Sequence, residues 1–146
     1  MPAHIFSIAN LVVIAGWLSL AVFPRQRWAR IVSAGVVPGL LAAAYVVIVA
    51  SVWGKSEGGF SSLADVARLF ENPWMLLAGW LHYLAFDLLV GNWIVRDARA
   101  HGIAHGWVLP LLLLTFLFGP SGWLAYLGVR AIKGQPVSAT PIEAAT

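Results

Sequence analysis

Four long runs of apolar residues, separated by short polar segments, set the pattern of the chain. The runs cover roughly Ile5–Phe23, Ile31–Trp53, Pro73–Val95 and Trp107–Ile132. Each is close to the roughly 20 residues that an α-helix needs to cross the hydrocarbon core of a bilayer. Tryptophans near several of their ends suit the membrane–water interface. The pattern predicts an all-α polytopic membrane protein in which residues 1–133 form a bundle of four transmembrane helices.

The loop between the second and third runs has a pattern of its own. Apolar residues recur there at helical spacing, namely Phe60, Leu63, Ala67 and Phe70. Ser62 and Asp65 have the spacing of an N-terminal capping box, and Asn72 before a proline ends the segment. These features favour a short amphipathic helix that lies in the headgroup plane. An ordinary structured loop is the alternative.

Composition supports a membrane location, because 60% of the 146 residues are hydrophobic and only 10% are charged. A soluble domain carries about 25% charged residues. The absence of cysteine excludes disulfides, thiolate metal sites and cysteine nucleophiles. The net charge of +3 comes from basic residues beside the apolar runs, which suits anionic lipid headgroups and argues against nucleic-acid binding. The polar tail, residues 134–146, is predicted to be disordered.

The placement of basic residues predicts an orientation. The loops after the first and third runs hold Arg25, Arg27, Arg30, Arg96 and Arg99. The opposite face of a four-span protein holds Lys55, Arg68, Arg130 and Lys133. Since basic residues accumulate on the cytoplasmic side, the first two loops are expected in the cytoplasm and both chain ends outside.

The third run contains two side chains that a bilayer should reject, His82 and Asp87. An ionised Asp at the centre of a span costs about 2.5–3.5 kcal/mol, so Asp87 is expected to face the bundle interior and to keep its proton. It shares a helix face with Tyr83, whereas His82 lies about 140° away around the helix. Both residues are expected in the dry bundle interior, facing other helices and not lipid tails. There they suit either a polar clamp between helices or a functional site, and intramembrane ionisable groups favour the site.

Depth counted along antiparallel spans predicts two polar layers about 7–8 Å apart. One layer contains Asp87 and Thr115. The other contains His82, Asn10, Tyr45 and Ser121. For Asn10, a hydrogen bond between helices is the favoured role. Pro120, in the middle of the fourth run, predicts a kink that serves either a site or helix packing.

A second group, Asp97, His101 and His105, would line one helix face if the third helix continued. Gly102 and Gly106 argue against a continuous helix there. The two histidines are therefore expected in an interfacial turn, and no metal site is predicted. Structural zinc also usually takes four protein ligands.

Several segments resemble one known family, namely residues 6–10, 33–38, 78–88, 96–98, 102–105 and 114–120. Together they are similar to the bacterial branch of the abscisic-acid-deficiency-type membrane proteins, whose plant members are needed to make neoxanthin from violaxanthin. The most specific part is Trp-x-His-x-x-Ala-x-Asp, from Trp80 to Asp87. The resemblance covers the chain from Ile5 to Ile132.

The resemblance implies action on a xanthophyll, by isomerisation of an epoxide to an allene and a hydroxyl group. That chemistry needs one proton given and one removed, and no cofactor. Asp87 is then the acid and His82 the base, with Asn10 and Tyr45 positioning the oxygen. The remaining substrate-binding candidates are Trp80, Tyr83, Thr115, Pro120 and Ser121.

Other functions stay open at this stage. The chain could be a non-catalytic pigment- or lipid-binding subunit, a proton-coupled carrier, or a structural subunit. The partners expected are the lipid bilayer and a carotenoid or other isoprenoid ligand, without nucleic acid. A homo-oligomer and a larger membrane complex are both compatible with this size. The expected location is a bacterial inner membrane.

Overall fold

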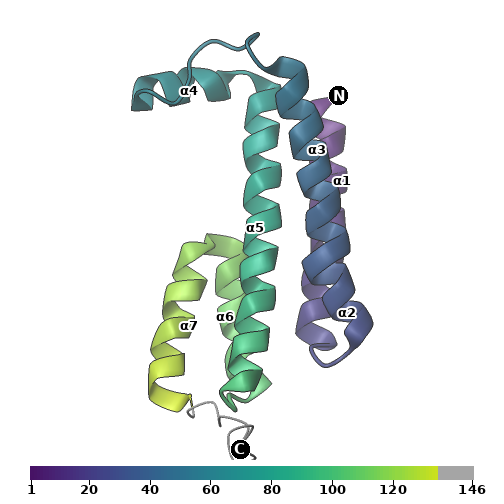
Figure 1. Cartoon of the computed structure of the whole chain (residues 1–146), viewed down its shortest axis with the longest axis vertical. Helices are drawn as coiled ribbons and strands as arrows, with labels where there is room; N and C mark the ends of the chain where they lie inside the picture. The colour runs from purple at the N-terminus through teal and green to yellow at the C-terminus, as the bar shows by residue number, and fades with distance from the viewer. Residues whose placement is uncertain (135–146) are drawn as a thin grey trace, which may run out of the picture. The chain divides into compact units, whose positions relative to one another are not determined.

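The computed structural model is all-helical over the residues that it describes, 1–134 (Figure 1). Most of the tail predicted to be disordered, residues 135–146, lies outside this described part. The helices are α1 (Pro2–Val22), α2 (Arg27–Ile31), the π-helical turn η1 (Val32–Val36), α3 (Val37–Val52), α4 (Leu63–Glu71), α5 (Pro73–Ala100), α6 (His105–Phe118) and α7 (Pro120–Lys133). Contacts divide the chain into two compact units, which meet between Asn92 and Trp93 within α5.

Three helical segments are long and apolar enough to cross a membrane: Pro2–Val22, Arg27–Val52 and Pro73–Ala100. They correspond to the first three predicted runs. The second is continuous through α2, η1 and α3, and its π-helical turn marks a local widening of the helix. The all-α fold expected from the sequence is therefore confirmed, and these three helices have the length and composition of membrane spans.

The predicted fourth span differs in the structure, because Trp107–Ile132 is not one kinked helix. α6 ends at Phe118, Gly119 has a φ of +44°, and α7 begins at Pro120. A positive φ is open to glycine, and a proline in the first turn of a helix needs no backbone donor. The result is a pair of helices of 14 residues each that pack against one another.

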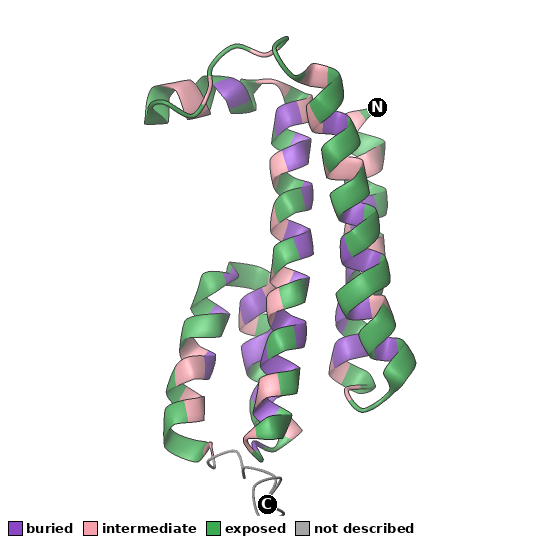
Figure 2. Ribbon diagram, viewed as in Figure 1, coloured by how far each residue is buried: buried purple, intermediate pink, exposed green. Residues whose placement is uncertain are grey.

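The first unit, residues 1–92, packs its long helices closely at two glycines. A Cβ on Gly16 would lie 2.6 Å from a methyl group of Leu88, and one on Gly91 would lie 2.6 Å from the ring of Trp17. Figure 2 shows buried residues along the facing sides of α1, α3 and α5 and exposed residues on their outer sides. The outer residues are largely apolar, as a lipid-facing surface requires, and Leu11 is 71% exposed.

The predicted amphipathic helix is present as α4. The hydroxyl of Ser62 accepts a hydrogen bond from the backbone N–H of Asp65 at 3.1 Å, as an N-cap does. The hydroxyls of Ser61 and Ser62 donate to the Asp65 carboxylate at 2.6 and 2.7 Å, and they lower the pKa of that carboxyl. Asn72 ends α4, and its side chain accepts a hydrogen bond from the N–H of Trp74 at 2.9 Å, which caps α5.

Candidate functional site

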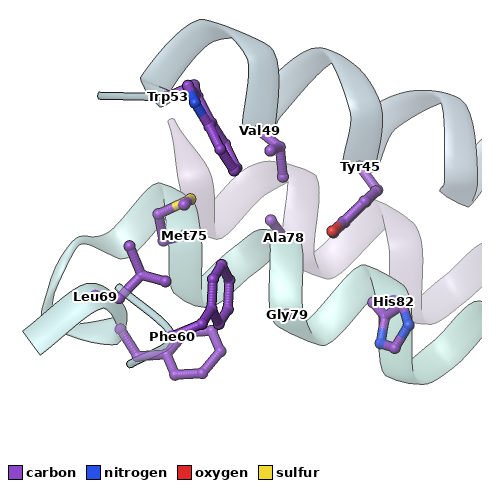
Figure 3. Close-up of a pocket in the computed structure, with 10 residues that line it drawn as sticks. Tyr45, Val49, Trp53, Phe60, Leu69, Met75, Ala78, Gly79 and His82 are labelled. Carbon is purple, nitrogen blue, oxygen red and sulfur yellow. The ribbon is translucent and has the colours of Figure 1, made fainter. Parts of the chain in front are cut away.

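A cavity of about 380 Å³ lies in the first unit between α3, α4 and α5 (Figure 3). Its lining residues are mostly apolar or aromatic: Tyr45, Val49, Trp53, Phe60, Leu69, Phe70, Met75, Ala78, Gly79 and His82. Small-molecule sites occupy about 300–1,000 Å³ and combine an apolar lining with a few polar groups. The cavity has that character, and its volume is near the lower end of the range.

The two polar ring side chains of the cavity, Tyr45 and His82, are neighbours. Their ring centres are 5.9 Å apart, and His82 also lies against Phe86 with ring centres 4.6 Å apart. In Figure 3 they occupy the end of the cavity away from Trp53 and Met75. The cavity therefore has an apolar end next to α4 and a polar end further along α3 and α5, away from α4.

The exposure of His82 corrects one expectation from the sequence. Its side chain is exposed, not enclosed in the bundle interior, while Tyr45 is half-buried. The reason is that α4 closes only the other end of the cavity. There, Phe70 packs directly on the backbone of α5, because a Cβ on Gly79 would lie 2.8 Å from the Phe70 ring. His82 is almost one turn further along α5, beyond that cover.

Asp87 forms a second polar centre on α5, as part of a pair with Tyr83. The two side chains share a hydrogen bond, in agreement with their i, i+4 spacing. Asp87 is half-buried, and its Oδ2 atom is buried with no hydrogen-bond partner within residues 1–134. An unpaired buried carboxylate oxygen is costly, which makes Asp87 unusual among the described residues. Asp87 and Tyr83 are not among the residues that line the cavity.

Asn10 has the interhelical hydrogen bond expected of it. The indole N–H of Trp80 donates to the side-chain oxygen of Asn10 at 3.0 Å, which ties α5 to α1. The ring of Trp80 also contacts those of Phe6 and Tyr83 in tilted arrangements, at ring-centre distances of 5.4 and 5.3 Å. The depth predicted for Asn10 was close to correct, but its partner is Trp80, and it does not line the cavity of Tyr45 and His82.

The other three predicted site residues belong to the second unit. Thr115 is fully buried, and its hydroxyl donates to the carbonyl oxygen of Leu111 at 2.8 Å. Pro120 is the first residue of α7, and Ser121 follows it with an exposed side chain. The structure thus gives Thr115 and Pro120 clear roles in shaping the α6–α7 pair.

A polar cluster in the second unit has members that the sequence did not suggest. The Nε of Arg130 lies 3.0 Å from a carboxylate oxygen of Asp97, and the hydroxyl of Tyr126 donates to the same carboxylate. The Nη2 of Arg130 is 2.9 Å from the Nε2 of His101, whose Nδ1 is 2.8 Å from the backbone oxygen of Asp97. Since a guanidinium group only donates, His101 accepts at Nε2 and carries its proton on Nδ1.

This cluster explains the spacing of Asp97 and His101, which could also suit a metal. Within residues 1–134, no group of three potential metal-binding side chains is close enough together to hold an ion. His105 begins α6 after a turn at Gly102, which has a φ of +68°, so the helix face that would have aligned three ligands is interrupted. The Arg130 guanidinium contacts both Asp97 and His101 instead.

A buried hydrogen bond in the first unit also went unpredicted. The amide of Asn92 donates to the hydroxyl of Ser33 at 2.7 Å, and both side chains are almost completely buried. Ser33 lies within η1, where the helix is wider than an α-helix. The sequence did contain one indication of this bond, because the amide of Asn92 lies within a predicted membrane span and needs a hydrogen-bond partner there. Periodicity alone gave no indication that Ser33 would supply it.

Comparison with known proteins finds one family. The model of the family described as ABA DEFICIENT 4-like matches residues 4–126, which include the cavity, Asp87 and the Asp97–Tyr126 pair. Neither the curated proteins nor the solved structures contain a match to the chain.

Proposed function

The chain belongs to the ABA DEFICIENT 4-like family, and from that we propose that it acts on a carotenoid or a related isoprenoid lipid. Its three membrane-length helices and this family indicate a membrane protein related to neoxanthin synthesis. The observation that carries the proposal is the cavity of Tyr45 and His82. It combines an apolar, aromatic lining with two polar rings, as the oxygenated ring of such a lipid requires.

The shape of the cavity supports entry of the ligand from the bilayer. Its volume of about 380 Å³ suits one ring end of a long isoprenoid, and the rest of the molecule then lies among lipid tails. We propose that α4 lies in the headgroup plane and closes the apolar end of the cavity, away from His82. Phe60 and Leu63, which are 74% and 87% exposed, would then reach into the lipid.

The proposed reaction is an isomerisation by acid–base catalysis. A C–O bond of the substrate epoxide breaks, and its oxygen receives a proton and becomes a hydroxyl group. The neighbouring polyene carbon loses a proton, and the electron pair of that C–H bond forms the new double bond of the allene. Atoms and electrons balance without an added reactant.

His82 is the proposed base, because a neutral imidazole in the cavity can accept the carbon-bound proton. Asp87 is the proposed acid, supported by its buried oxygen and its hydrogen bond to Tyr83. Because Asp87 does not line the cavity, this role requires the substrate oxygen to extend from the cavity towards Asp87 along α5. Tyr45 is proposed to help position that oxygen. Asn10 contributes by holding Trp80 in place.

The remaining residues are proposed to shape the substrate site. Trp80 and Tyr83 extend an aromatic surface along α5. Thr115, Pro120 and Ser121 would have an indirect role, because they determine the structure of the α6–α7 pair and do not line the cavity. We propose that the protein is located in the inner membrane of a bacterium, because its sequence resembles the bacterial branch of this family.

Pigment analysis of cells that make violaxanthin tests the proposal. Cells that also express the chain should accumulate neoxanthin or another isomer of equal mass. His82→Gln and Asp87→Asn should each lower the product by about 100-fold or more, the usual contribution of an acid or base. His4→Gln is the matched control, because His4 is exposed near the start of α1, outside the cavity. Full activity of both variants at equal protein levels would remove the proposed mechanism.

A binding role without turnover is the second candidate. The observation that favours it is the exposure of His82, since proton-transfer catalysis is more effective in a site that excludes water. Under this alternative the same cells would yield the chain with bound pigment and an unchanged set of pigments.

A further inference from the structure

The second unit contains two helices that are too short to cross a membrane. α6 and α7 have 14 residues each, which at 1.5 Å per residue gives a length of about 21 Å. The hydrocarbon core of a bilayer is about 30 Å thick. An apolar helix of this length that is followed by a second one must therefore enter the membrane and return, or lie at its surface.

The two helices are antiparallel and touch through their backbones. A Cβ on Gly122 would lie 2.3 Å from the backbone nitrogen of Thr115, so no larger residue fits at this crossing. Thr115 keeps its hydroxyl within its own helix by donating to Leu111. Such small-residue contacts are how helices associate in a bilayer, where apolar burial alone gives no driving force. The crossing adjoins the turn at Gly119, so the chain reverses direction there.

The open ends of this hairpin are joined to each other and to the end of α5. Arg130, in the last turn of α7, pairs with Asp97 and His101 at the end of α5. The Nζ of Lys133, the last residue of α7, lies 4.1 Å from the centre of the Trp107 ring at the start of α6. The carboxyl ends of α5 and α7 therefore lie next to each other.

This arrangement changes the distribution of charge across the membrane. With three crossings and one hairpin, one face carries Arg25, Arg27, Arg30, Arg96, Arg99, Arg130 and Lys133. The other face carries only Lys55 and Arg68. Four full crossings would divide the same nine residues five to four. The strong asymmetry of seven to two is what the positive-inside rule describes.

We propose that α6 and α7 form a re-entrant hairpin, and that the basic residues at its base bind anionic lipid headgroups of that leaflet. Arg96, Arg99 and Lys133 are exposed, and Lys133 lies on an exposed tryptophan, the usual side chain of the membrane interface. Asp97 is already paired with Arg130, so it leaves the base of the hairpin positively charged. This inference concerns the second unit and is independent of the activity proposed for the first.

The natural absence of cysteine makes the topology directly testable. Four full-length single-cysteine variants, Glu57→Cys, Ala100→Cys, Ser121→Cys and Ile132→Cys, all replace exposed residues. In sealed vesicles of known orientation, a membrane-impermeant maleimide should label positions 100 and 132 from one face and position 57 from the other. Position 121 should be labelled at least tenfold less from either face. Labelling of positions 57 and 132 from the same face, or rapid labelling of position 121, would overturn the hairpin.

Fluorescence quenching tests the lipid contact. In vesicles of phosphatidylcholine with one quarter phosphatidylglycerol, the signal of Trp107 is taken as the difference between the chain and its Trp107→Phe variant. Brominated phosphatidylglycerol should quench it at least twofold more than brominated phosphatidylcholine at equal content. The preference should disappear when Arg96, Arg99 and Lys133 are all replaced by Gln. Equal quenching by the two lipids in the unchanged chain would overturn the headgroup assignment.

Discussion

The guanidinium group of Arg130 lies 3.0 Å from a carboxylate oxygen of Asp97 and ties the last turn of α7 to the last turn of α5. The Arg130 side chain is 37% exposed and that of Asp97 is 15% exposed, so solvent screens the pair in part. Arg130→Gln should lower the free energy of unfolding by about 1 kcal/mol. Denaturant titration in detergent, followed by circular dichroism, measures this change.

Arg96→Gln is the control for that experiment, because Arg96 is an exposed arginine at the same end of α5. Its effect should be within about 0.5 kcal/mol. An equal loss in both variants would show that the Arg130–Asp97 pair has no specific role.

Two glycines of α7 should respond oppositely to alanine. Gly122→Ala places a methyl group into the backbone of Thr115 and should lower the free energy of unfolding by about 1–3 kcal/mol or prevent the hairpin from closing. At Gly128 a Cβ would meet nothing within 4 Å, so Gly128→Ala should leave stability unchanged or raise it by up to about 1 kcal/mol. Thermal unfolding of both variants in the same detergent decides this. Similar midpoints would contradict the close crossing.

The buried pair of Asn92 and Ser33 should show energetic coupling. Ser33→Ala leaves the Asn92 amide without the acceptor that lies 2.7 Å away. A double-mutant cycle with Ser33→Ala and Asn92→Ala should give a coupling of about 1 kcal/mol, within the range measured for hydrogen bonds between membrane helices. Additive effects of the two substitutions would mean that the bond contributes nothing to stability.

The start of α4 should be sensitive to acid. The hydroxyls of Ser61 and Ser62 hold the pKa of the Asp65 carboxyl below its ordinary value of 3.8. A lowered folded-state pKa means that the stabilising effect is complete above pH 3.8 and is lost as the pH falls through the lower, folded value. Amide NMR resonances of residues 62–66 should titrate in this acidic range. They should not do so in Asp65→Asn, and the same titration in that variant would exclude the carboxyl as its cause.

The local features of this fold were predictable because short-range patterns determine them. Apolar run length gave the three membrane-length helices, and the spacing of Ser62 and Asp65 gave the N-cap of α4. The i, i+4 spacing of Tyr83 and Asp87 likewise predicted their shared face, which their hydrogen bond reflects.

The features that were missed depend on contacts between distant parts of the chain. A proline after Gly119 is equally compatible with a kink and with a reversal. The difference is made by Gly122 against Thr115 and by Arg130 against Asp97. The exposure of His82 depends on where α4 stops covering α5. The hydrophobic periodicity of either helix does not predict that position.

The central claim is that the cavity between α3, α4 and α5 holds an isoprenoid ring, and the amount of bound xanthophyll tests it most directly. Val49 lines the cavity, whereas Val47 is on the same helix, is 68% exposed and does not line it. Violaxanthin that remains with the purified chain, measured by absorbance per mole of protein, should fall at least tenfold in Val49→Trp. It should be unchanged in Val47→Trp. Equal pigment in Val49→Trp and the unchanged chain would contradict the claim that this cavity is the binding site.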